Sequence, residues 1–253
     1  MFEWFISNED KTGERNEDSY IFMFPYAGGG ASVFKKWQVY FKGFEVFAAQ
    51  YPGRENRINE KPIDKFDEIL SNLYDSISKF IFTGSRYYLF GHSLGTKIVY
   101  ELVLKIKENK LRMPEGIIVS AGKAPCFKEE NPIYYLEDDE FIKGINRFSG
   151  TPSEIIENND IMKIFLPMLR ADFILDETYV NPNITKIDVP ILGLMGTEDK
   201  ELTIDELLKW KEYTSQDFSY KYIEGGHMFI NTNTEKVASE IKKFIYKCND
   251  KSI

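Results

Sequence analysis

Short apolar runs alternate with amphipathic segments along most of the 253-residue chain. The apolar runs are continuous, as in strands buried on both faces, and they lie at residues 20–24, 44–49, 87–90, 116–120, 189–194 and 219–223. Apolar spacing near 3.6 predicts helical segments at residues 33–40, 69–80, 94–106 and 237–245. The alternation indicates an α/β fold, with a mostly parallel central sheet covered by helices on both faces. The length suits a single domain spanning residues 1–253.

One region breaks this alternation. More than sixty residues separate the strand ending at Ser120 from the strand starting at Val189, and they show helical patterns at 138–148 and 160–173. A connection does not need this length, so we expect a functional insertion: a helical lid over about residues 125–185. Its expected lining consists of Phe141, Ile145, Phe148, Ile161, Phe165, Met168 and Phe173. Most of these side chains should pack the lid onto the core, and a minority should touch a ligand.

The lid is expected to cover the sequence Gly91-His92-Ser93-Leu94-Gly95. This Gly-x-Ser-x-Gly motif follows a predicted strand and precedes a predicted helix, which is the context of a nucleophile elbow. Such a turn lifts the serine hydroxyl clear of the sheet, and it leaves no room for side chains two residues before or after the serine. The plainer alternative is a Ser/Gly turn that only joins a strand to a helix.

A serine nucleophile needs a base that takes its proton, and the chain has only two histidines. His92 adjoins Ser93 in a tight turn, where neighbouring side chains point in different directions, so we expect it to pack behind the turn. His227 follows the last predicted strand and two glycines, which suits a loop that carries an imidazole over the sheet edge. His227 is therefore the predicted base.

The third group, which orients the base, is expected between the serine and the histidine in chain order. The strand at 189–194 is followed by Glu198 and Asp199, and a carboxylate there could reach the base. We predict Asp199 in preference to Glu198; Asp205 and Asp176 are weaker candidates. The alternative is that Glu198 and Asp199 belong to a solvated turn.

Acyl transfer also needs donors for an oxyanion. The backbone N–H of Leu94 is one predicted donor, because it follows the nucleophile. The other should come from the loop after the 20–24 strand, with Ala27 as first choice and Tyr26 as second. The glycines at 28–30 let that backbone approach closely; they could suggest a phosphate loop, but Gly-Lys-Ser/Thr is missing.

Composition narrows the class of protein further. A net charge of −8 and a pI near 5.1 argue against a nucleic-acid binder. Cys126 and Cys248 suit neither a metal site nor a disulfide framework, and no metal-ligand cluster or dinucleotide fingerprint indicates a cofactor. The apolar N-terminus is too short for a signal peptide, and it runs into a solvated lead-in at 7–18. No apolar run approaches the length of a membrane span, so we expect a cytoplasmic protein, by default a monomer.

Five segments together resemble the external, or type II, thioesterases that accompany nonribosomal peptide and polyketide synthases. They are Phe24-Pro25-Tyr26-Ala27-Gly28-Gly29, Gln50-Tyr51-Pro52-Gly53-Arg54-Glu55, Phe90-Gly91-His92-Ser93-Leu94-Gly95, Leu166-Pro167-Met168-Leu169-Arg170-Ala171-Asp172-Phe173 and Gly225-Gly226-His227-Met228-Phe229. The resemblance covers nearly the whole chain and implies an α/β-hydrolase fold. Gly196-Thr197-Glu198-Asp199 departs from the Gly-Asp-x-Asp pattern of many relatives, which makes the acid the weakest of the three assignments.

The resemblance implies an acyl thioester substrate on the phosphopantetheine arm of an acyl or peptidyl carrier protein. The enzyme would clear aberrant or blocking acyl groups from carriers, using Ser93, His227 and Asp199. Candidate substrate contacts are Tyr26, Phe141, Phe165, Met168, Phe173 and Met228. Carriers are often acidic, so a docking face should be locally basic or apolar. Candidate docking cations are Lys35, Lys36, Arg54 and Arg57, and neither Trp37 nor Arg54 is assigned a catalytic role.

Two other hypotheses remain open from the sequence. One keeps the same catalytic residues but assigns another substrate: an acyl-CoA or fatty-acyl thioester, or a small carboxylic ester. The other is a binding or scaffold protein that has lost catalysis. An intact serine, acid and histidine order with a glycine-rich oxyanion loop favours an enzyme over the scaffold.

Overall fold

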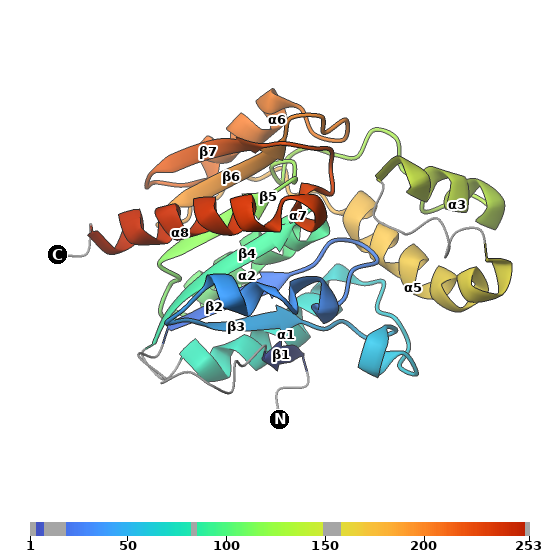
Figure 1. Ribbon diagram of the computed structural model, residues 1–253, viewed down its shortest axis with the longest axis horizontal. Coiled ribbons are helices and arrows are strands. Elements are labelled where there is room, and N and C mark those ends of the chain that lie inside the picture. The colour runs from blue at the N-terminus through green and yellow to red at the C-terminus, as the bar shows by residue number, and fades with distance from the viewer. Residues whose placement is uncertain (1–3, 8–18, 82–84, 149–157, 251–253) are drawn as a thin grey trace.

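The computed structural model describes residues 4–7, 19–81, 85–148 and 158–250 (Figure 1). Their centre is a seven-stranded sheet with the order β1-β3-β2-β4-β5-β6-β7. The strands are β1 (Phe5–Ser7), β2 (Ser19–Phe24), β3 (Glu45–Ala49), β4 (Arg86–His92), β5 (Gly116–Ser120), β6 (Ile191–Gly196) and β7 (Phe218–Ile223). All neighbours pair in parallel except β1, which runs antiparallel to β3 at one edge. The predicted mostly parallel sheet is confirmed, and the three-residue β1 is an addition that the hydrophobic pattern did not indicate.

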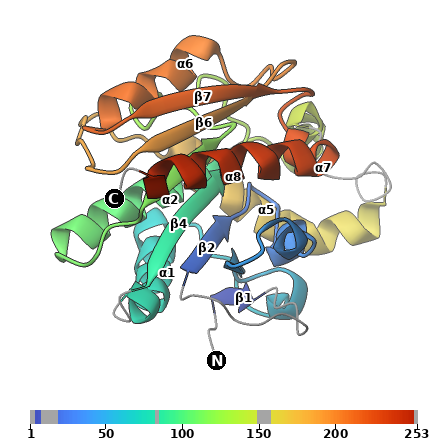
Figure 2. The same ribbon diagram turned by 60° about the vertical axis from the view of Figure 1, so that its left-hand side comes forward.

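Side chains alternate between the two faces of the sheet, as strand geometry requires. On β4, Tyr87 and Leu89 join one hydrophobic cluster, whereas Tyr88 and Phe90 join the other. The helices α1 (Phe66–Ile81) and α2 (Leu94–Glu108) cover the first face, together with α6 (Ile204–Leu208) and η5 (Lys209–Tyr213). The second face is covered by η1 (Ala31–Phe34), η2 (Trp37–Tyr40), α7 (Phe229–Thr232) and α8 (Thr234–Asp250), and Figure 2 shows α8 crossing in front of the strands. The predicted two-sided cover is confirmed.

The predicted helical piece at 33–40 consists of two short 3-10 turns, η1 and η2, instead of a continuous helix. Phe34 and Trp37 are both buried, at 0% and 2% exposure. A 3-10 turn has three residues per turn, so it aligns positions three apart on one side. Within η1 this spacing lets Ala31 and Phe34 both enter the core, where Trp37, the first residue of η2, joins them.

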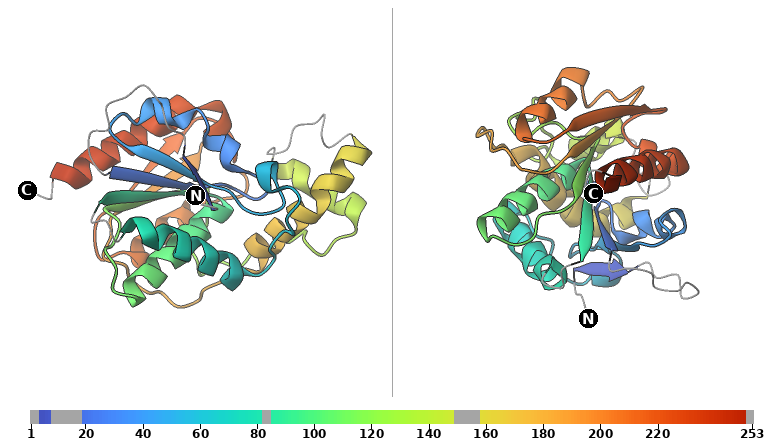
Figure 3. Two further views of the ribbon diagram at one scale, coloured as in Figure 1. Left: turned by 90° about the horizontal axis from the view of Figure 1, so that it is seen from below. Right: turned by 90° about the vertical axis from the view of Figure 1, so that its left-hand side faces the viewer.

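The insertion forms a separate layer beyond the ends of the strands, as the left view of Figure 3 shows. It contains α3 (Asp138–Ile145), η4 (Asn146–Phe148) and α5 (Asn159–Thr178). These elements share a third hydrophobic cluster, separate from the two clusters that sandwich the sheet. The predicted helices of the insertion are therefore present, while part of the expected lid, residues 149–157, lies outside the described residues, as does most of the expected lead-in at 7–18.

The second half of α5 is fastened to the main body through α2. Lys97 on α2 forms an ion pair with Asp176 at 2.6 Å, and the Tyr179 hydroxyl donates to Glu101 at 2.7 Å. At its other end, α5 begins after Asn158, whose side chain accepts hydrogen bonds from two backbone N–H groups of the first turn. In the described part of the chain, none of the helices is both long and apolar enough to cross a membrane.

Candidate active site

The turn between β4 and α2 places Ser93 in a conformation that L-residues rarely adopt, with φ 53° and ψ −116°. A Cβ on Gly91 would overlap the backbone carbonyl of Gly95. A Cβ on Gly95 would overlap the carbonyl oxygen of Phe24 at the end of β2. The prediction that neither flanking position admits a side chain is confirmed, and the turn has the geometry of a nucleophile elbow.

Hydrogen bonds join the three predicted catalytic side chains in series. His227 Nε2 lies 3.2 Å from Ser93 Oγ, and His227 Nδ1 lies 3.1 and 3.0 Å from the two oxygens of Asp199. The Asp199 side chain is fully buried, and that of His227 is 8% exposed. An ionised carboxylate only accepts hydrogen bonds, so Nδ1 carries the proton and Nε2 is left as the acceptor for the serine hydroxyl. This is the tautomer that a general base requires.

The competing acids lie elsewhere. Glu198 and Asp205 are exposed, and Asp176 pairs with Lys97. Asp199 also accepts a hydrogen bond from the backbone N–H of Glu201 at 2.9 Å, which fixes its carboxylate. Of the four candidate carboxylates, Asp199 alone has a hydrogen bond to His227 among the contacts within the described ranges.

His92 lies behind the elbow, as expected, and it is fully buried. Its Nε2 lies 3.0 Å from the carbonyl oxygen of His227, and its Nδ1 lies 2.8 Å from Ser120 Oγ. A carbonyl only accepts, so Nε2–H donates to it, and Nδ1 accepts from the Ser120 hydroxyl. Burial lowers the pKa of His92 well below its ordinary value, which keeps the ring neutral and suits one donor and one acceptor. The sequence did not indicate this second role, in which His92 holds the backbone of the other histidine.

The predicted oxyanion donors lie on the two segments that meet at the elbow. Leu94 is the first residue of α2, so its N–H has no acceptor within the helix. Phe24 pairs with Gly91 across the sheet, which places the following loop beside Ser93. Within that loop, Ala27 packs against both the core and the lid cluster.

Tyr26, the second choice for the oxyanion loop, directs its side chain away from the lid cluster. Its ring packs edge-on against His92 with centroids 5.8 Å apart, and its hydroxyl accepts from Asn231 at 3.2 Å. Burial raises the pKa of the Tyr26 hydroxyl, so it stays neutral. Met228 is 8% exposed and, like Tyr26, belongs to the hydrophobic cluster between the sheet and α8.

The lid side chains differ in how close they come to the histidine. The Phe148 ring lies 5.8 Å from the His227 ring and 5.3 Å from Phe173, which in turn packs on Phe141. Phe141, Phe173, Ile145 and Met168 are buried inside the lid cluster, and Phe165 is partly buried against it. Ile161 is 36% exposed and does not belong to the lid cluster, so the expected packing of this side chain with the others is not found. Phe148 was expected in the lining but was not among the candidate substrate contacts.

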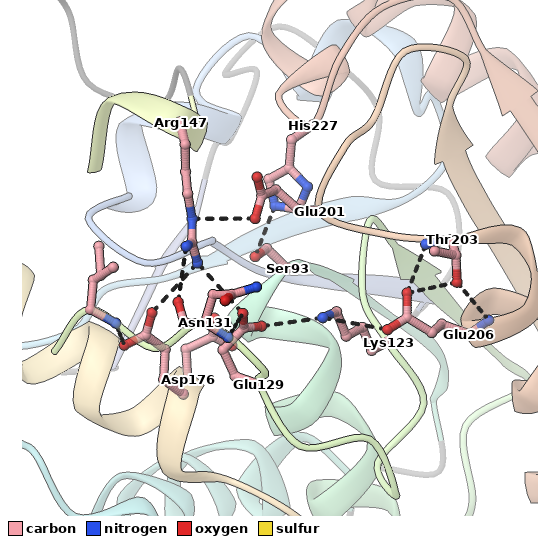
Figure 4. A network of polar contacts seen from close by, with 12 residues as sticks. Ser93, Lys123, Glu129, Asn131, Arg147, Asp176, Glu201, Thr203, Glu206 and His227 are labelled. Carbon is pink, nitrogen blue, oxygen red and sulfur yellow. Dashed lines mark hydrogen bonds and ion pairs between the residues drawn. The ribbon is translucent and has the colours of Figure 1, made fainter. Parts of the chain in front are cut away.

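Figure 4 shows an ion cluster around Arg147, the residue that precedes Phe148. The Arg147 guanidinium stacks over the Phe148 ring at 4.5 Å and pairs with Glu201, Glu129 and Glu177 at 3.3, 3.5 and 3.8 Å. Its Nη1 donates to the carbonyl of Asn131 at 2.9 Å. With Arg147 itself, the cluster joins four different segments, so no local sequence pattern could indicate it.

Two of the predicted docking cations are wrong. Arg54 is 3% exposed and Arg57 is 7% exposed, so neither can meet a partner protein. Arg54 pairs with Asp172, and Arg57 binds Glu60 and lies 4.4 Å over the Trp4 ring. Lys35 and Lys36 are exposed. Arg54 was misassigned because its carboxylate partner, Asp172, is 118 residues away in the sequence. Arg57 was misassigned because the Trp4 ring, from the start of the chain, covers its guanidinium.

A serine, an aspartate and a histidine in this chain order, at the ends of parallel strands and with a nucleophile elbow, define the class of α/β-hydrolases. Within that class, residues 19–245 match the model of the family described as a thioesterase domain. The chain belongs to the thioesterase family, and it is a hydrolase of thioester bonds.

Three relatives illustrate the match. The chain is 33% identical over 231 residues to the gramicidin S biosynthesis protein GrsT of Aneurinibacillus migulanus, covering 90% of this chain and 88% of that protein. It is 30% identical over 238 residues to the medium-chain S-acyl fatty acid synthase thioesterase of Rattus norvegicus, covering 90% and 87%. The solved structure of the type II thioesterase BorB from the borrelidin biosynthetic cluster superposes with a TM-score of 0.82 at 26% identity, covering 95% and 96%. The resemblance to type II thioesterases is confirmed.

Proposed function

We propose that this protein is a serine thioesterase that hydrolyses acyl thioesters from the phosphopantetheine arm of carrier proteins, and so removes aberrant or blocking acyl groups during nonribosomal peptide or polyketide synthesis. The observation that carries the proposal is the hydrogen-bond series from Ser93 through His227 to Asp199 in a member of the thioesterase family. Relatives named for gramicidin S biosynthesis and for the borrelidin cluster support the carrier-bound substrate.

In the proposed reaction, Ser93 Oγ attacks the thioester carbonyl while His227 Nε2 takes its proton. Asp199 stabilises the imidazolium that forms. The N–H groups of Leu94 and Ala27 hold the negative oxygen of the tetrahedral intermediate. The C–S bond then breaks and the pantetheine thiol leaves with the proton. Water, activated by His227, hydrolyses the acyl-serine and releases the acid.

The lid would shape the acyl site. The Phe148 ring packs against the His227 ring, and we propose that Phe148 lines the site together with the earlier candidates Tyr26, Phe141, Phe165, Met168, Phe173 and Met228. Because most of these side chains are buried, they would set the shape of the acyl site by supporting the side chains that line it. Lys35 and Lys36 remain the docking cations for an acidic carrier.

We further propose that residues 1–253 form one domain, with the lid inserted at about 125–185, and that it works as a cytoplasmic monomer. Both cysteines, Cys126 and Cys248, are free thiols, which suits a reducing compartment.

A second candidate is an acyl-CoA or fatty-acyl thioesterase, favoured by the 30% identity to the rat fatty acid synthase thioesterase. Such an enzyme, or a small-molecule carboxylesterase, would use the same three side chains. The substrate alone separates these candidates from the proposed function.

The test measures hydrolysis of acetyl- and longer acyl-phosphopantetheinyl carrier protein, acyl-CoA and p-nitrophenyl esters. Ser93→Ala and His227→Ala should each lose at least about 10³-fold in kcat, and Asp199→Asn about 10⁴-fold through the wrong imidazole tautomer. Glu198→Gln is the matched control, because it changes an exposed neighbouring carboxylate and should keep full activity. A preference for free esters over carriers by orders of magnitude would discard the proposed substrate. Full biological output from Ser93→Ala, with none from a deletion, would favour the scaffold hypothesis.

A further inference from the structure

The lid helix and the loops around the elbow meet at a buried ion pair. Asp172 on α5 is fully buried, and Arg54, after β3, is 3% exposed. Arg54 Nη1 lies 2.5 Å from Asp172 Oδ2, and Nη2 lies 2.8 Å from Oδ1. The pair is thus bidentate, the arrangement that fixes orientation as well as distance.

The remaining hydrogen bonds of the pair go to backbone groups, and two of these belong to the oxyanion loop. The N–H of Gly28, the residue after Ala27, donates to Asp172 Oδ2 at 2.7 Å. Arg54 Nη1 donates to the carbonyl of Gly29 at 3.1 Å, and Nη2 donates to Pro52 at 3.2 Å. The ion pair therefore holds the loop from both its N–H side and its C=O side.

The loop lies directly on α5 at this point. Gly28 has a φ of +84°, and a Cβ there would be 2.7 Å from Leu169 Cδ2. Leu169 and Asp172 are three residues apart, so they share one face of the helix. The lid helix therefore constrains the conformation of Gly28, the residue after the proposed oxyanion donor, through an apolar contact with Leu169 and a hydrogen bond to Asp172.

A stability role alone is a weak explanation for this arrangement. Replacing a buried ion pair by well-packed apolar side chains is often neutral or stabilising, so such a pair is poor evidence of stabilisation. Geometry is the stronger explanation, because an oxyanion donor must be preorganised at hydrogen-bond distance from the developing charge. The Ala27–Gly28 peptide is held by Asp172, which restricts the orientation of the Ala27 N–H one residue earlier.

We propose that Asp172 and Arg54 are positioning residues for the oxyanion donor Ala27, so that the lid helix α5 forms part of the scaffold of the oxyanion hole. This inference rests on the proposed function. Its consequence is that the tetrahedral intermediate is stabilised fully only while the face of α5 that carries Leu169 and Asp172 lies on the loop.

The experiment compares two double variants that remove the same charges. Arg54→Met with Asp172→Asn keeps a side-chain oxygen that can accept from Gly28, whereas Arg54→Met with Asp172→Leu does not. Both are assayed for kcat and KM on acyl-pantetheine, and for inhibition by a trifluoromethyl ketone analogue, whose adduct with Ser93 carries an oxyanion. The two proteins differ only in the acceptor at position 172.

The Leu variant should lose about 10- to 100-fold in kcat, somewhat less than the loss of a whole oxyanion donor. Its KM should change by less than about threefold, and the inhibition constant of the ketone should rise by the same factor as kcat falls. The Asn variant should stay within about fivefold of the wild type on each measure. A purely structural role predicts that the two variants behave alike.

Equal kcat values for the two double variants, whether high or low, would overturn the proposal. Should the Leu variant fail to fold, amide hydrogen exchange of the wild type decides: the Gly28 N–H must be protected, and free exchange overturns the proposal. Ser93→Ala distinguishes failure of this proposal from failure of the proposed function. Activity without Ser93 would discard the serine mechanism, whatever the results for the variants at position 172.

Discussion

The lid helix α5 carries two buried carboxylates, and each faces an arginine from another part of the chain. Asp172 binds Arg54 through two hydrogen bonds of 2.5 and 2.8 Å. Glu177 lies 3.8 Å from Arg147, beyond hydrogen-bond distance. One arginine is thus locked to its carboxylate, and the other is held by looser ion pairs.

The difference extends to the remaining partners. Glu177 Oε2 accepts from the backbone N–H groups of Ile133 and Tyr134 at 2.8 Å, whereas Oε1 has no hydrogen-bond partner in the described part of the chain. Burial raises the pKa of Glu177 to about 7, against the opposing hydrogen bonds and the Arg147 charge. The same helix therefore carries one carboxylate, Asp172, that fixes the geometry of the oxyanion loop, and another, Glu177, beside Arg147, that can change its charge near neutral pH.

Removing Asp172 should break the locked contact and give the largest effect. Asp172→Ala leaves the Arg54 charge buried without its partner, so the free energy of unfolding should fall by about 3–5 kcal/mol in urea titrations. Asp176→Ala on the same helix is the control; its ion pair with Lys97 is less buried and should cost about 1 kcal/mol. Equal losses of unfolding free energy in the two variants would contradict the view that the Asp172–Arg54 contact is the stronger of the two.

Neutralising Glu177 should change how the free energy of unfolding depends on pH. The folded-state pKa of about 7 exceeds the ordinary value of 4.5, so between these values the folded protein holds a proton that the unfolded chain has lost. Glu177 therefore lowers stability as the pH rises from 4.5 to about 7. Glu177→Gln should remove this decline, a gain of roughly 2 kcal/mol at about pH 8 relative to about pH 5, measured by unfolding at both pH values.

The exposed neighbour Glu130 provides the control for Glu177, because Glu130→Gln also removes one carboxylate but should leave the pH profile of stability unchanged. The interpretation fails if Glu177→Gln follows the wild-type profile. It also fails if the profile of Glu130→Gln flattens equally.

Removing the Arg147 charge should have a smaller effect, mainly on catalysis. Arg147→Met keeps the chain length but loses the stacking over Phe148 and the ion pairs with three glutamates. We expect kcat/KM to fall about fivefold, corresponding to roughly 1 kcal/mol. Lys143→Met removes a lid cation from a highly exposed pair with Glu140 and should leave kcat/KM unchanged. Steady-state kinetics at low and high salt provide the measurement, and a salt-independent loss would exclude an ionic cause.

The smallest effect is expected from Phe148→Leu. This change keeps an apolar side chain but loses the ring contacts with His227 and Phe173. Such aromatic pairs contribute about 0.5–1.5 kcal/mol, and leucine keeps part of the apolar contact, so kcat/KM should fall by about threefold, or roughly 0.65 kcal/mol, with Asp199 and Ser93 untouched. Tyr135→Leu on the exposed lid surface is the matched control. An equal fall in kcat/KM for this variant would show that the ring contacts of Phe148 have no specific role.

The parts of this molecule that could be predicted are those with local signals. The strand–turn–helix context indicated the elbow, and having only two histidines left His227 as the base. Asp199 was chosen correctly as the carboxylate that reaches His227, although its loop departs from the pattern of relatives. Apolar runs and apolar periodicity also indicated the mostly parallel sheet and the helical insertion.

The parts that were missed depend on contacts between distant segments. Arg54 was expected at a docking surface because a charged side chain is usually exposed, but Asp172, 118 residues away, holds it in the interior. The Arg147 cluster assembles from four segments, and β1 is too short to show a period. Burial of charge is set by tertiary partners, which no window along the chain contains.

The backbone of Ser93 has a thermodynamic consequence. A non-glycine residue at φ 53° and ψ −116° carries strain of about 1–3 kcal/mol, and the surrounding sheet, helix and glycines must compensate for it. Glycine would adopt the same angles without that strain, so the chain would be more stable without its proposed nucleophile. Selection for stability alone would therefore erase the serine, and its presence marks a trade of folding free energy for reactivity.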